Sequence, residues 1–185
     1  MLPPGHIAAG YIVSNIFLKL SHPQLPLSDQ NTLLLWGIFF SFAPDLDFFV
    51  AFNKTKSLTI SDDVNHRNMY SHAPIIWLVA GLIVVFYGWL LDSVFVEMFG
   101  LLLWLGSWTH FVLDTIQYGI MWLWPWSKGL VALRDKGIKS NLPPSSFLRH
   151  WLNFLKFYVT KIKLTFYLEL IVIATAIITY TYIVK

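Results

Sequence analysis

APIIWLVAGLIVVFYGWLL, residues 73–91, is a run of nineteen residues without a single charged side chain. Such a run is long enough to cross the hydrocarbon core of a bilayer as one α-helix, which takes about 20 residues. A second apolar run follows at about residues 94–114, and only Asp92 and Ser93 separate the two. A connection this short leaves room only for a tight turn, so the sequence predicts an antiparallel helical hairpin in the membrane.

Three further stretches have the composition of membrane helices. Residues 31–52 contain the segment Pro44-Asp45-Leu46-Asp47 near their end, and residues 164–184 form the last apolar run. Residues 5–20 are a shorter candidate, whose small side chains have the spacing that lets transmembrane helices pack closely (Gly5, Ala8, Ala9 and Gly10). We therefore predict an all-α membrane bundle of four or five spans, formed by residues 1–185 as a single integral-membrane domain.

Residues 115–163 are predicted to form a cytoplasmic and interfacial connection that does not span the membrane. Its first part holds tryptophans around Pro125 that are typical of an interfacial aromatic belt (Trp122, Trp124 and Trp126). Residues 147–163 alternate bulky apolar side chains with the basic residues Arg149, Lys156, Lys161 and Lys163. This pattern predicts an amphipathic helix that lies on anionic lipid or leads into the last span.

The composition agrees with a membrane location, and the distribution of basic residues indicates the orientation of the chain in the membrane. Apolar residues make up 56% of the chain and charged residues 12%, about half the charged fraction of a soluble domain. Eleven of the thirteen Lys and Arg residues lie in two connections, at residues 53–72 and 115–163. The positive-inside rule places both connections in the cytoplasm, together with the N-terminus if there are five spans. Because these charges flank spans and do not form one compact patch, we expect lipid contact and no nucleic-acid partner.

The histidines and carboxylates of this apolar chain gather at the cytoplasmic ends of the predicted spans. Seven of them lie there, from four separate stretches: His6, Asp45, Asp47, His66, His72, His110 and Asp114. A lone charged Asp at a bilayer centre costs about 2.5–3.5 kcal/mol and less near the interface, so such groups need partners. The chain has no cysteine, so imidazole and carboxylate groups alone would hold a metal. We predict that these seven side chains are the candidate ligands of a shared metal site.

The spacing of these residues refines the prediction. His110 and Asp114 are four residues apart, which places them on one face of a helix, one turn from each other. Asp45 and Asp47 are two residues apart and would point in different directions in a regular helix. Pro44 disfavours helical geometry at the residue before it, so the backbone can be irregular here and turn both carboxylates inward. Alternatively, one carboxylate binds metal and the other orients a ligand.

Other polar residues have a supporting role or a simpler interpretation. Arg67 can hold an anionic group such as a phosphate, and Ser71 can hydrogen-bond a ligand or a bound water. Asp45 or Asp47 taken alone could instead cap a helix. Glu169 lies within the last predicted span without a candidate ligand near it in the sequence, so we assign it to helix packing.

The order of these motifs resembles a known family. An early histidine, His6, precedes Pro44-Asp45-Leu46-Asp47; residues 66–72 then read HRNMYSH, and residues 110–114 read HFVLD. This order, followed by Trp122-Leu123-Trp124-Pro125, is similar to that of the membrane-bound metal-dependent hydrolases. They are also called the LexA-binding, inner-membrane-associated hydrolase family. The resemblance covers about residues 5–126, and the chain contains no recognisable LexA-binding site.

The resemblance implies a bacterial or archaeal inner-membrane protein with metal-dependent hydrolase activity. A looser similarity to zinc-dependent phospholipases C implies a phosphoester substrate in a lipid or lipid-linked molecule. The family often has Gly and Thr within the segment where this chain has Asn68, Met69 and Tyr70. The lining of that loop therefore differs, while every candidate ligand is kept.

These observations predict a metal-dependent hydrolase with a cytoplasmic active site. Seven ligands exceed one tetrahedral site, so either two ions bind or the surplus residues act as acid, base and support. We expect zinc, with manganese or iron as alternatives, to activate a water whose proton passes to Asp47 or Asp114. Arg67 would offset charge on a phosphate-like transition state, and Ser71 would hydrogen-bond the ligand or water. Two other functions remain open: a metal or proton transporter, and a non-catalytic membrane protein with a structural metal site.

Overall fold

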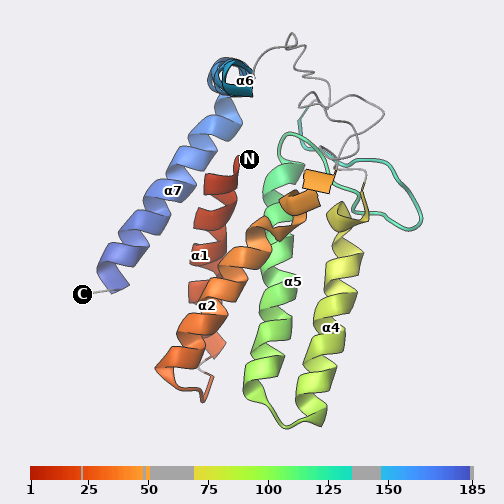
Figure 1. Ribbon diagram of the computed structural model, residues 1–185, viewed down its shortest axis with the longest axis vertical. Helices are drawn as coiled ribbons and strands as arrows, with labels where there is room; N and C mark the ends of the chain where they lie inside the picture. Colours follow the sequence, from red (N-terminus) through yellow and green to blue (C-terminus); the bar gives the residue numbers. More distant parts are fainter. Residues whose placement is uncertain (22, 48, 51–68, 135–146, 184–185) are drawn as a thin grey trace.

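The computed structural model describes residues 1–21, 23–47, 49–50, 69–134 and 147–183 (Figure 1). Six α-helices lie within these ranges: α1 (Pro3–Ser21), α2 (Leu27–Phe42), α4 (Pro74–Leu90), α5 (Val94–Thr115), α6 (Phe147–Lys161) and α7 (Lys163–Ile183). Two short 3₁₀ helices accompany them, η1 (Ala43–Leu46) after α2 and η4 (Tyr70–His72) before α4. No β-strand occurs in the described ranges, and the prediction of an all-α fold is confirmed.

The hairpin predicted from residues 73–91 and 94–114 is formed by α4 and α5. Its turn is a Schellman motif, in which the amide of Asp92 donates to the carbonyl of Trp89 at 3.2 Å and that of Ser93 to the carbonyl of Gly88 at 2.9 Å. Asp92 takes the left-handed conformation that this motif requires, with φ of 51°. Asp is among the few residues other than glycine that tolerate this conformation, which is why so short a connection can reverse the chain.

The helix predicted at residues 31–52 has different bounds in the structure. α2 begins at Leu27 and ends at Phe42, and the chain then tightens into η1 over Ala43–Leu46. Ala43 keeps helical dihedral angles, with φ of −54° and ψ of −36°, so the expected effect of Pro44 on the residue before it does not occur. The proline acts instead through its missing amide proton, which leaves one α-helical hydrogen bond unmade. The backbone therefore departs from α geometry at Pro44, as a 3₁₀ turn, but not for the reason that the sequence suggested.

Small residues bring the helices of the bundle close together. α5 packs against α1, α2 and α4, and Figure 1 shows it running alongside α4. A Cβ atom added to Gly81 of α4 would lie 2.8 Å from the carbonyl oxygen of Gly100 of α5. A Cβ atom on Gly10 of α1 would lie only 2.1 Å from the hydroxyl of Ser41 of α2. Close backbone approach of this kind stabilises helix pairs in lipid, where apolar burial cannot drive their association.

Two of the described helical segments are long and apolar enough to cross a membrane, Val94–Thr115 and Lys163–Tyr182, and Pro74–Leu90 is a shorter apolar helix. This number is smaller than the four or five spans that the sequence predicted. α2 has 16 residues, which cover about 24 Å at 1.5 Å per residue. Its first turn is polar and includes Asp29, so its apolar part is shorter still.

The C-terminal helices and one loop complete the fold at one end of the bundle. Figure 1 shows α6 nearly end-on above the start of α7, so their axes cross steeply, and α7 descends beside α1. Residues 116–134 form a loop without an α-helix, in which Ile120 and Val131 pair as an isolated antiparallel bridge. This end also holds the N-terminus, η1 and the last turn of α5.

Candidate metal centre

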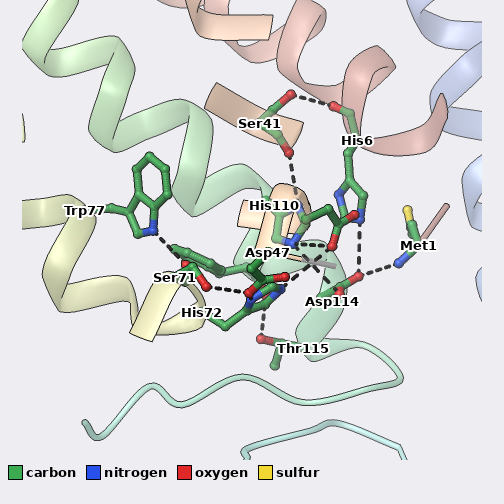
Figure 2. Close-up of polar contacts among 12 residues, drawn as sticks. Met1, His6, Ser41, Asp47, Ser71, His72, Trp77, His110, Asp114 and Thr115 are labelled. Carbon is green, nitrogen blue, oxygen red and sulfur yellow. Dashed lines mark hydrogen bonds and ion pairs between the residues drawn. The ribbon is translucent and has the colours of Figure 1, made fainter. Parts of the chain in front are cut away.

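Four segments that are distant in sequence meet at this end of the bundle. The first turns of α1 bring His6, the 3₁₀ helices η1 and η4 bring Asp45 and His72, and the last turns of α5 bring His110 and Asp114. The helices alternate in direction, so the start of α1, the end of α2, the start of α4 and the end of α5 lie at one level (Figure 1). The imidazole and carboxylate groups point toward one another there (Figure 2).

Four of these residues form a compact group of metal donors. Asp45, His72, His110 and Asp114 each offer one ligand atom, and these atoms all lie within 4.8 Å of one another. The Nε2 atom of His110 lies 3.6 Å from Oδ1 of Asp45 and 3.9 Å from Oδ2 of Asp114. The Nε2 atom of His72 lies 3.7 Å from Oδ1 of Asp45. Two imidazole nitrogens and two carboxylates suit zinc or another divalent transition metal.

The carbonyl of Ser41 holds the His110 ring. Nδ1 of His110 lies 3.0 Å from the Ser41 carbonyl oxygen, which can only accept, so Nδ1 carries the proton. In the neutral ring the lone pair is then on Nε2. That atom is buried and has no hydrogen-bond partner among the described residues. Ligating histidines commonly donate their other N–H to a carbonyl in this way.

A carboxylate orients the second imidazole of the group. Nδ1 of His72 lies 2.8 Å from Oδ2 of Asp47, and the Ser71 hydroxyl donates to the same oxygen (Figure 2). The Trp77 indole in turn donates to the carbonyl of Ser71 at 2.7 Å. This geometry matches the alternative in which one of the two neighbouring carboxylates faces the metal group, and the other orients a histidine. Asp45 is the carboxylate that faces the metal group, and Asp47 is the one that orients His72.

The charge state of Asp45 follows from its neighbours. Burial by itself would raise the pKa of this carboxyl, but the hydrogen bond with His72 and the contact with the His110 imidazole outweigh burial and hold the pKa well below its usual value. Asp45 therefore remains a carboxylate at neutral pH. An anion that is already ionised can bind a cation without first losing a proton.

His6 lies beside the four donors and contacts two of them. Its ring stacks on that of His110 with centroids 4.0 Å apart, and its Nε2 lies 3.3 Å from Oδ1 of Asp114. The amino group of Met1 pairs with the same carboxylate oxygen. His6 and Asp114 are both fully buried. His6 of α1 thus contacts both α5 members of the donor group, His110 and Asp114.

The predicted site residues fall into three sets in the structure. Asp45, His72, His110 and Asp114 form the donor group, while His6, Asp47 and Ser71 lie next to it. The predictions for His66 and Arg67 lie outside the described residues. The sequence did not indicate the supporting carbonyl of Ser41, because any residue type offers a carbonyl.

Comparison with known proteins agrees with the membrane interpretation. The family described as YdjM inner membrane protein matches residues 1–185. No curated protein and no solved structure matches the chain. The family description speaks of the inner membrane, while the hydrolase activity and the choice of zinc stay predictions.

Proposed function

The chain belongs to the YdjM inner membrane protein family, and from this premise we propose that it is a multi-pass, metal-dependent hydrolase. Its substrate would be a phosphoester or headgroup of a lipid or lipid-linked molecule. The site would lie at the cytoplasmic face, because the basic connections predicted to be cytoplasmic begin at the same end of the bundle. With α1, α2, α4, α5 and α7 as spans, the C-terminus would be outside.

The observation that carries this proposal is the state of His110. Its ring is fully buried and held by a carbonyl through Nδ1, and its Nε2 has no hydrogen-bond partner among the residues described. A buried polar atom without a partner costs about 1–3 kcal/mol, so proteins seldom keep one without a use. Here Nε2 faces the carboxylates of Asp45 and Asp114. An imidazole lone pair opposite two anionic groups is the arrangement that a divalent cation satisfies.

The residues around the donors divide the remaining tasks. Asp47 and the carbonyl of Ser41 keep His72 and His110 in the orientation and tautomer that a ligand needs. A bound divalent metal supplies Lewis-acid activation of water and of a phosphoryl oxygen. Asp114, itself one of the donors, would also accept the proton of that water. His66 and Arg67 remain predictions from the sequence, as a further ligand and an anion contact.

The surroundings of the site suit a substrate that is delivered from the membrane surface. α6 lies at this end of the bundle and carries Arg149, Lys156 and Lys161. In the loop of residues 116–134, Leu123 and Trp126 are exposed, and Tyr70 of η4 packs against Trp124. Basic and aromatic side chains in combination are typical of contact with lipid headgroups.

The test is metal analysis of purified protein combined with hydrolysis assays on phospholipids and prenyl phosphates. We expect the wild type to retain one or two divalent ions per chain and to lose both metal and turnover when stripped by a chelator. His110→Ala should abolish metal retention. Thr109→Ala is the matched control, because Thr109 precedes His110 on α5 and its hydroxyl bonds back to the Leu105 carbonyl within the helix.

Three outcomes would refute or narrow the proposal. A wild type that binds no divalent metal, or a His110→Ala variant that binds it as tightly, refutes the metal centre. Metal retained with no turnover of any lipid phosphoester refutes the hydrolase and leaves a structural site. Metal or proton flux across liposomes that is lost in His110→Ala would show a transporter instead.

A further inference from the structure

The carboxylate of Glu169, on α7, lies against the beginning of α1. Its Oε1 accepts a hydrogen bond from the amide of Gly5 at 3.1 Å, and its Oε2 accepts one from the amide of Leu2 at 3.3 Å. The hydroxyl of Tyr158, on α6, donates to Oε2 as well. Glu169 is only 4% exposed. The sequence-based assignment of Glu169 to helix packing is therefore incomplete, because the carboxylate has three polar partners, two of them at the opposite end of the chain.

A carboxylate at this place stabilises α1 for two reasons. The first amides of an α-helix have no partner within the helix, and the helix dipole favours a negative charge at that end. α1 has no acidic residue in its own first turn, so α7 supplies the charge. The approach depends on Gly5, since a Cβ atom there would lie 2.9 Å from Cγ of Glu169.

Tyr158 extends this contact to α6, the helix that crosses the start of α7. The residue is 1% exposed, and burial raises the pKa of its hydroxyl, so the group stays protonated and donates to Glu169. α6 and α7 are thus both tied to the start of α1 by one buried carboxylate.

The next residue after Gly5 is His6. Its Nε2 lies 3.3 Å from Asp114, and its ring stacks on His110. We propose that Glu169 is a positioning residue: by holding the first turn of α1, it sets the place of His6 against Asp114 and His110. The effect of Glu169 on metal binding rests on the proposed function, whereas its effect on the position of His6 does not.

The position of His6 can be measured by chemical modification in the full-length protein. Diethyl pyrocarbonate modifies accessible imidazoles, and His6, His72 and His110 are all fully buried in the wild type. With Glu169→Gln we expect His6 to be modified about tenfold faster, as loss of a hydrogen bond to a charged group makes local opening easier. His72 and His110 should stay protected, because neither is held by α7. Tyr158→Phe, which removes one donor and keeps the ring, should give a smaller change in the same direction.

Glu97→Gln is the matched control, since Glu97 lies in the first turn of α5, at the other end of the bundle. It should leave all three histidines as protected as in the wild type. If His6 is as slow in Glu169→Gln and Tyr158→Phe as in the wild type, the inference is wrong. If all three histidines become reactive together, Glu169 stabilises the whole bundle, and the specific positioning role is also refuted.

Metal affinity gives a second readout that separates positioning from general stability. We expect Glu169→Gln to weaken Co²⁺ binding about tenfold, the lower end of the range for residues that orient a metal site. In a His6→Ala background the same substitution should have no further effect, because its path to the site has been removed. An equal loss in both backgrounds contradicts the inference. A wild type that binds no Co²⁺, but whose His6 still responds to Glu169→Gln, refutes the proposed function alone.

Discussion

Replacing Asp47 by asparagine tests which of two neighbouring carboxylates belongs to the donor group. Oδ2 of Asp47 receives hydrogen bonds from Nδ1 of His72 and from the hydroxyl of Ser71, while Oδ1 of Asp45 faces the Nε2 atoms of the donor histidines. The two residues are chemically identical and only two positions apart. The structure nevertheless predicts different consequences for the same substitution at each place.

The loss of zinc affinity expected for Asp47→Asn follows from the contacts that this substitution weakens. Asparagine is neutral, so the hydrogen bond from His72 falls from the about 1.5–3 kcal/mol of a bond to a charged group to the about 0.5–1.5 kcal/mol of a neutral one, a loss of about 1–1.5 kcal/mol. Substitution of residues that orient metal-ligating histidines costs about 10–100-fold in metal affinity, or about 1.4–2.7 kcal/mol. The two ranges overlap near about 1.4 kcal/mol, and we expect zinc affinity to fall about tenfold. Ser71→Ala removes one donor to the same carboxylate but keeps the charge of Asp47 and its bond from His72, so it should weaken zinc binding less than Asp47→Asn does.

The assay is competition for zinc between the purified protein and a chromophoric chelator, with Co²⁺ absorption as a check on coordination. Asp45→Asn should weaken binding more than Asp47→Asn does and change the Co²⁺ spectrum, because a donor is lost. Asp47→Asn should weaken binding and leave the number of donors unchanged. The reasoning is refuted if Asp47→Asn costs as much as Asp45→Asn and changes the spectrum in the same way. Asp47 would then be a direct ligand.

Three further outcomes are expected. The pKa of Asp45 is lowered in the folded chain, so its carboxylate stabilises the metal-free protein at pH values above the unfolded pKa of about 3.9. This contribution disappears as the pH falls through the lower folded pKa. In thermal unfolding below about pH 4, the Tm of Asp45→Asn should therefore fall less than that of the wild type. Gly10→Ala forces a methyl group into the hydroxyl of Ser41 and should lower unfolding free energy by about 1–3 kcal/mol in denaturant titrations, whereas Gly129→Ala, in a loop, should change little. A peptide of residues 147–163 should bind anionic vesicles about 100-fold less tightly, at about 1 kcal/mol per charge, when glutamine replaces Arg149, Lys156 and Lys161; equal binding in a centrifugation assay would contradict an interfacial role for α6.

Much of the fold could be predicted because it is encoded locally. The absence of charge over residues 73–91 and the two-residue gap after it are sufficient for the hairpin of α4 and α5. A change of geometry at Pro44 was visible in the sequence as well, since proline has no amide proton with which to continue an α-helix. The length of α2 was not, because the apolar run continues past Phe42 while the helix does not.

The candidate site divides in the same way. Helices that alternate in direction bring their ends to common levels, so the order of His6, Asp45, His72, His110 and Asp114 along the chain was enough to predict that they gather at one end. Which of them face one another was not predictable. That depends on how far each helix is rotated and shifted against its neighbours, and small residues such as Gly10 set this by permitting close approach.

The sequence alone therefore determined a hydrophobic all-α chain with histidines and carboxylates at one end of its helices, because hydropathy and residue order depend only on neighbours in the chain. The tertiary structure decided that Asp45 faces the donor histidines while Asp47 orients His72, and that a carbonyl of Ser41 holds His110. It also decided that Glu169 reaches the first turn of α1 across 164 positions of sequence. Such contacts arise from packing between distant segments, and no local pattern of residues records them.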